Sequence, residues 1–172
     1  MKRAFISALC IVAALSVSAQ TLKSVLTQQL KSTHDKETWF VPVAVALDGV
    51  SAEQAVWTDG SGNHSIGQLA NHLLFWNERQ LIKFRGEQPK SFDGNNEETF
   101  NAFTKEQWEQ TVKKLNDVLA QLEQIIEKAD DASLKSWSET IANISTHNAY
   151  HTGQIIFVRK LQGSWKPQRG VK

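Results

Sequence analysis

Residues 65–80 read Ser-Ile-Gly-Gln-Leu-Ala-Asn-His-Leu-Leu-Phe-Trp-Asn-Glu-Arg-Gln, and this stretch decides the fold class. Ser65 is followed three residues later by Gln68, a capping box in which each side chain satisfies an unpaired backbone donor at a helix start. Apolar residues then return at helical spacing, and His72 lies on the same stripe as Leu69. The stretch therefore predicts an amphipathic helix whose inward face carries a histidine.

Three further stretches show the same helical period, and no stretch alternates convincingly with a period of two. The corresponding helices are expected to begin near Thr21, at Thr104 and near Ser136, the last two with a capping pair as well. The third helix is expected to end at about Ala129, and Gly163 suits the position just after the fourth. Four amphipathic helices without strands predict an all-α fold, a four-helix bundle.

Two interruptions are expected in this bundle. Pro42 lies in an apolar stretch, and proline removes a backbone donor and clashes with the preceding helical turn. We therefore expect a kink or a break in the first helix within residues 33–42. Residues 86–103 form a long polar connection between the second and third helices, long enough for a crossover rather than a tight turn.

The N-terminal segment has the features of a secretory signal peptide. The chain begins with basic residues, continues with an apolar stretch over residues 4–17 and reaches small residues before a cleavage point after Ala19. We expect residues 1–19 to be removed and residues 20–172 to form one domain in the periplasm or outside the cell. The apolar stretch is too short for a stable membrane span, so none is expected in the mature chain.

Removal of this segment also changes the composition. The only cysteine, Cys10, is lost, and the loss of Lys2 and Arg3 changes the formal net charge from +1 to −1. The mature chain therefore has no thiolate nucleophile, disulfide or cysteine ligand, and any metal must be bound by nitrogen and oxygen atoms. The nearly neutral charge argues against nucleic acid or an anionic membrane surface as a partner.

Three histidines are the candidate functional residues of this chain. His147 and His151 are four residues apart, which places both imidazoles on one helix face, and His72 lies on the inward stripe of another helix. Each ring alone is most simply explained as a hydrogen-bonded core histidine. Together, unliganded rings would lose hydration and repel one another once protonated. A divalent metal would remove both costs, and three protein ligands leave an open coordination position, as in catalytic metal sites.

Three stretches of the chain resemble the DinB/YfiT-like superfamily of four-helix bundles. These are residues 64–73, with a capping serine, Ile-Gly, histidine and leucine; residues 147–154, with H-x-x-x-H followed by Gly-Gln; and the closing residues 159–163. With the helices between them, the resemblance covers nearly all of residues 21–163.

This resemblance implies a divalent transition metal, typically nickel, zinc or iron, held by three histidines. On this sequence they are His72, His147 and His151. Characterised relatives are similar to metal-dependent thiol transferases, isomerases or hydrolases. The signal peptide is a departure from the usual cytoplasmic setting, and it argues against thiol transfer because the usual thiol cofactors are cytosolic.

Three other residues are predicted to lie near the metal or its pocket. Trp76 is four residues after His72, Gln154 is three residues after His151, and Arg159 is two helical turns beyond it. Each also has a purely structural explanation. Trp76 is explained by core packing, Gln154 by helix–helix hydrogen bonding and Arg159 by an exposed salt bridge. His34 lies in a polar stretch and is predicted to be solvated.

The sequence thus predicts an exported protein with an open three-histidine site, acting as a metal-dependent hydrolase or transferase on a small-molecule substrate. The alternative is a non-catalytic metal-binding or interaction protein of the cell envelope. A plain bundle with structural histidines is the third hypothesis. Whether the bundle is a monomer or a homodimer is left open.

Overall fold

The computed structural model describes residues 21–101 and 103–170, so the predicted signal peptide, residues 1–19, lies outside the described residues. Within these ranges the chain forms helices and turns and no β-strand. Four long helices make up the bundle: α1 (Leu22–His34), α4 (Ile66–Phe84), α6 (Trp108–Lys128) and α7 (Asp131–Leu161). The prediction of an all-α four-helix bundle is confirmed.

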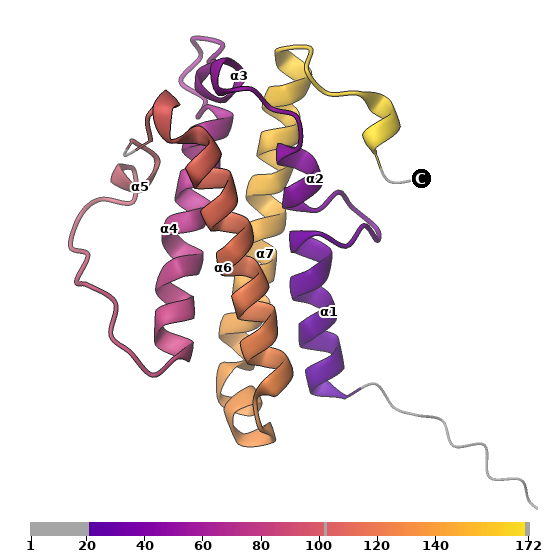
Figure 1. Ribbon diagram of the computed structural model, residues 1–172, viewed down its shortest axis with the longest axis vertical. Helices are drawn as coiled ribbons and strands as arrows, with labels where there is room; N and C mark the ends of the chain where they lie inside the picture. The colour runs from indigo at the N-terminus through magenta and orange to yellow at the C-terminus, as the bar shows by residue number, and fades with distance from the viewer. Residues whose placement is uncertain (1–20, 102, 171–172) are drawn as a thin grey trace, which may run out of the picture.

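The four long helices form a ring in which α6 and α7 lie between α1 and α4 (Figure 1). Helix α4 packs against both α6 and α7, and α1 does the same from the other side. Helices α1 and α7 run in one direction along the bundle, whereas α4 and α6 run in the other. The inward stripe of α4 therefore faces the antiparallel helix α7.

The core is built from the apolar stripes that the sequence shows. The core includes Leu69 and Leu73 of α4 together with Leu115 and Leu122 of α6, and all four side chains are at most 1% exposed. Removal of this apolar surface from water is the main stabilising contribution to the bundle. It also holds α4 rigidly, which matters because His72 belongs to the same stripe.

The first interruption is a break rather than a kink. Helix α1 ends at His34, and Pro42 precedes a separate short helix, α2 (Val43–Leu47), where its missing N–H breaks no helical hydrogen bond. A further short helix, α3 (Ala52–Val56), follows and begins with a capping box at Ser51. The break lies within the predicted residues 33–42.

The second interruption is a crossover that carries the chain back along α4. It contains the short helix α5 (Glu98–Asn101) and the 3₁₀ turn η1 (Lys105–Gln107), and it returns to the end of the bundle where α4 begins (Figure 1). Helix α6 therefore runs parallel to α4. Phe103 packs so closely on Gly67 that a Cβ atom there would lie 2.0 Å from the ring.

The predicted start of the last helix near Ser136 is wrong. Helix α7 begins five residues earlier, because the side chain of Asp130 accepts a hydrogen bond from the backbone N–H of Ser133 at 2.8 Å. Ser136 and Glu139 lie inside the helix, where the capping-box spacing occurs by chance.

Of the helices that the structure describes, none is long and apolar enough to cross a membrane.

Candidate metal centre

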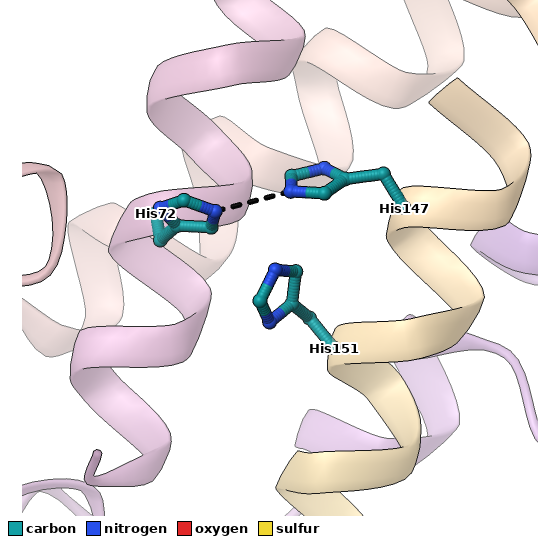
Figure 2. A group of neighbouring side chains, drawn as sticks. All are labelled: His72, His147 and His151. Carbon is teal, nitrogen blue, oxygen red and sulfur yellow. Dashed lines mark hydrogen bonds between the residues drawn. The ribbon is translucent and has the colours of Figure 1, made fainter. Parts of the chain in front are cut away.

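The three predicted histidines converge between α4 and α7. Nε2 of His72 lies 3.0 Å from Nε2 of His147, and a ring nitrogen of His151 faces the gap between the two (Figure 2). One nitrogen from each ring lies within 4.8 Å of the other two. His72 and His151 are at most 7% exposed, so two of the three rings are buried. The predicted convergence of His72 with His147 and His151 is therefore present in the structure.

A buried amide pair fixes the position of one helix relative to the other. Nδ2 of Asn77 donates to Oδ1 of Asn148 at 2.8 Å, and both side chains are at most 2% exposed. Asn148 immediately follows His147, and Asn77 lies just over one turn beyond His72 on α4. Because a buried polar pair is costly to separate, it holds the histidines of α7 opposite His72.

The crossover determines which nitrogen of His72 carries the proton. The hydroxyl of Thr99 donates to the backbone carbonyl of Asn96 at 2.7 Å, which uses its only hydrogen. Nδ1 of His72 lies 2.5 Å from the same oxygen and must therefore be the donor. The proton is on Nδ1, so the lone pair of His72 is on Nε2, the atom that faces the other rings.

Gln154 fixes the ring of His151 in the same way. Its Oε1 atom, an acceptor, lies 2.6 Å from Nδ1 of His151, so that nitrogen donates and Nε2 retains its lone pair. Figure 2 shows Nε2 of His151 facing the gap between the other two rings. Two of the three rings thus present unprotonated nitrogens to one point, which is the arrangement that a divalent metal requires.

The surroundings keep these rings neutral. Burial, together with the neighbouring histidines, lowers the pKa of His72 to about 3. Burial and the charge of His151 lower the pKa of His147 to about 4. Burial also lowers the pKa of His151, and the hydrogen bond to Gln154 acts in the opposite direction. At neutral pH the donor set is therefore three uncharged imidazoles.

The rings open onto a cavity of about 750 Å³ between α4 and α7. Aromatic side chains surround its metal end. The ring of Phe100 stacks on His72 at 3.9 Å between ring centroids, and Trp76 meets His72 edge-on at 6.5 Å. Tyr150 lies against His151 at 5.0 Å. A cavity of this size, with aromatic walls and a few convergent polar groups, is typical of a small-molecule site.

Comparison with known protein families matches residues 43–155, about two thirds of the chain, to the DinB superfamily. The chain belongs to the DinB superfamily. Comparisons with curated proteins and with solved structures gave no match. The donor set of this DinB-superfamily chain fits a divalent transition metal, because imidazole nitrogens suit zinc, nickel and iron and the Nε2 atoms of His72 and His151 are unprotonated.

Arg159 lies outside the cavity of this DinB-superfamily chain. It is 3% exposed, and its Nη1 atom donates to the backbone carbonyls of Ala46 and Asp48 at 2.6 and 3.1 Å. Its Nη2 atom donates to the carbonyl of Ser164 at 3.1 Å. The guanidinium thus joins the end of α2 to the segment after α7. It is neither the exposed salt bridge nor the substrate-binding group that the sequence suggested.

The prediction of a solvated His34 is also wrong. Its Nδ1 atom lies 2.6 Å from Oε1 of Glu123 on α6, and the two side chains are 8% and 12% exposed. With Asp35, these residues form a second group whose ligand atoms lie within 4.8 Å of one another. Asp35 is exposed, and the His34–Glu123 pair satisfies itself, so this group has less need of an ion than the three histidines.

Sequence reasoning missed the residues that surround the histidines. Thr99 and Phe100 belong to the crossover, and nothing in their local pattern indicates contact with His72. Asn77 does carry a signal, because it lies four residues after Leu73 on the inward stripe of α4. A polar residue at such a position needs a partner, and Asn148 is that partner.

Proposed function

We propose that this protein is an exported enzyme that holds one divalent metal through His72, His147 and His151 and uses it for hydrolysis or group transfer on a small molecule. One observation carries the proposal: three neutral imidazoles converge at one end of a cavity, and hydrogen bonds leave two of their lone pairs directed at the same point. Membership of the DinB superfamily supports metal binding, and the finer assignment rests on this geometry.

Each part of the site has a separate task in this proposal. The three histidines hold the ion, while Thr99 and Gln154 keep the rings of His72 and His151 in the tautomer that can bind it. An ion bound there would act as a Lewis acid and favour the deprotonated form of a water or thiol beside it.

The cavity favours an enzyme over a metal-storage protein. A storage site gains nothing from an adjoining space of about 750 Å³, whereas a small-molecule substrate requires one. Phe100 and Trp76 pack against His72 and provide apolar surface beside the proposed metal for the substrate to contact. Among the described residues that line the cavity there is no carboxylate, so a nucleophilic hydroxide would depend on the lowered pKa of a metal-bound water rather than on a carboxylate base.

Export is the second part of the proposal, and it rests on the sequence of residues 1–19. A periplasmic or secreted setting favours hydrolysis over transfer of a cytosolic thiol. Cell fractionation and N-terminal sequencing of the mature protein test this part, with a chain beginning at Gln20 as the expected result. A cytoplasmic protein that retains Met1 would contradict export. It would not affect the proposal of a three-histidine metal site.

The metal site is tested by elemental analysis of the mature protein purified without a histidine tag. The wild-type protein should contain one zinc, nickel or iron ion per chain, and His151→Ala should contain none. His34→Ala is the matched control, because it removes a buried histidine from the second group and should leave the metal content unchanged. Loss of metal in His34→Ala and retention in His151→Ala would sink the assignment.

The reaction is tested with the metal-loaded protein against panels of esters, amides and thiol acceptors. Turnover that a chelator abolishes, and that added metal restores, is the expected result for an enzyme. Stoichiometric metal with no turnover in any panel would favour the alternative of a non-catalytic metal-binding protein.

A further inference from the structure

The cavity extends along the bundle well beyond the three histidines. On α4 its lining residues extend from His72 to Lys83, and on α7 they extend from His151 to Thr140. Each span is eleven residues, or about 16 Å at the rise of an α-helix. Because the two helices are antiparallel, both spans lead from the histidines toward the same end of the bundle (Figure 1). The space therefore suits an elongated ligand.

The two halves of the cavity differ in chemistry. The aromatic residues Trp76, Phe100 and Tyr150 surround the histidine end. The far end is lined by polar side chains that have no hydrogen-bond or ion-pair partner among the described residues. These are Gln80, Lys83, Thr140 and Asn143. Free polar groups gathered at one end of a cavity are available to bind a polar group of the ligand.

The permanent charge of the cavity lining is positive. Lys83 is the one permanently charged side chain among its described lining residues, and no aspartate or glutamate is among them. The three histidines are neutral, so a divalent ion bound to them would keep its full charge of about +2. With Lys83, the cavity would then carry a positive charge at each end and no protein carboxylate to balance either.

We propose that the cavity binds an elongated anion, with one group at the metal and a carboxylate or phosphate at Lys83. This inference rests on the proposed function, because it needs the ion at the histidine end. It adds the chemical class of the ligand and the residue that selects it. The aromatic residues contact the part of the ligand next to the metal, and Gln80 and Asn143 flank its anionic end.

A pair of probes of equal length tests the inference. Both are hydroxamates, which bind metals through their head group, with an alkyl chain long enough to reach Lys83. One chain ends in a carboxylate and the other in a primary alcohol. The protein is loaded with cobalt(II), whose visible spectrum reports binding of the head group without any need for activity.

The carboxylate probe should bind about fivefold more tightly than the alcohol probe at low salt, and this preference should disappear at high salt. Lys83→Gln should abolish the preference, whereas Lys83→Arg should retain it. Lys160→Gln is the matched control, because it removes an exposed lysine of α7 that does not line the cavity, and it should change nothing.

Equal binding of the two probes by the wild-type protein would overturn the inference, and so would a preference that survives in Lys83→Gln. In both cases the cobalt spectrum would still show an occupied three-histidine site, so the proposed function would stand. Failure of the protein to take up cobalt would instead contradict the proposed function and this inference together.

Discussion

Thr99 accepts a hydrogen bond from Nδ1 of His72 at 2.5 Å, although the two residues are 27 positions apart and belong to the crossover and to α4. The same hydroxyl donates to the carbonyl of Asn96, which leaves it only the acceptor role toward the ring. The tautomer of His72, a proposed metal ligand, is thus set by a segment outside the helices that carry the three histidines.

Loss of this hydrogen bond should weaken metal binding. Thr99→Val keeps the shape of the side chain but removes the acceptor for His72, so its ring is free to protonate at Nε2. We expect metal affinity to fall about 10- to 100-fold, measured by competition with a chromophoric chelator. Thr99→Ser retains the hydroxyl and should bind as the wild type does. Equal affinities in the valine and serine variants would contradict this role of Thr99.

The metal-free protein should lose stability in acid. His72 and His147 have pKa values of about 3 and about 4 in the folded chain, against an ordinary value of 6.5. The unfolded chain therefore binds more protons over this interval. The free energy of unfolding should fall as the pH is lowered from about 6.5 to about 3, and these two groups should add no further loss below that pH.

Urea unfolding of the metal-free protein at a series of pH values measures this dependence. His147→Gln lacks one of the two groups, so its free energy of unfolding should fall less over the same pH interval. The comparison cancels the carboxylates that both proteins share. Parallel pH profiles for the two proteins would show that His147 keeps its ordinary pKa in the folded chain.

Two glycines on long helices should respond in opposite ways to alanine. In Gly67→Ala the new Cβ atom meets the ring of Phe103 at 2.0 Å, so the crossover must shift, at a cost of about 1–3 kcal/mol in stability. Gly153 has no atom within 4 Å of the corresponding position, and Gly153→Ala should stabilise α7 by about 1 kcal/mol. Thermal and urea unfolding measure both. Similar effects at the two sites would rule out a tight contact at Gly67.

Arg159→Lys should destabilise the fold and leave metal binding intact. A lysine cannot reproduce the forked contacts of Arg159 with the carbonyls of Ala46, Asp48 and Ser164, so we expect a loss of about 1–3 kcal/mol. Arg85→Lys, at an exposed arginine, is the control and should change stability by less than about 0.5 kcal/mol. A variant of Arg159 that is stable yet loses metal would show that the residue acts on the site.

The sequence predicts the fold and the convergence of the histidines because both depend on helical periodicity. Ser65 starts α4 where its capping box places it, and His72 points inward because its stripe does. The start of α7 is missed because Asp130 caps it without the paired spacing of a capping box. Arg159 and His34 are misjudged for another reason: their partners lie on other elements, 113 and 89 positions away.

The difference between contacts within one helix and contacts between distant elements also explains the rest of the site. Gln154 is foreseeable because it lies on the helix of His151, within one turn. Thr99 and Phe100 are not, because their contacts with His72 depend on the path of the crossover. That path follows from the packing of Phe103 against Gly67, which a single sequence does not reveal.

The site draws on two parts of the chain, the helices α4 and α7 that carry the three histidines and the crossover that leads from α4 to α6. The three proposed metal ligands belong to helices whose spacing the bundle core fixes, so they tolerate little change. Residues 86–95 are mostly exposed and connect α4 to Asn96 without contributing a ligand. Insertions or deletions there would change the path by which the chain reaches Asn96 and Phe100, which line the cavity, while the helices that carry the three histidines stay in place. Variation in this segment is therefore a route by which the substrate of the proposed site would change without loss of the three histidines.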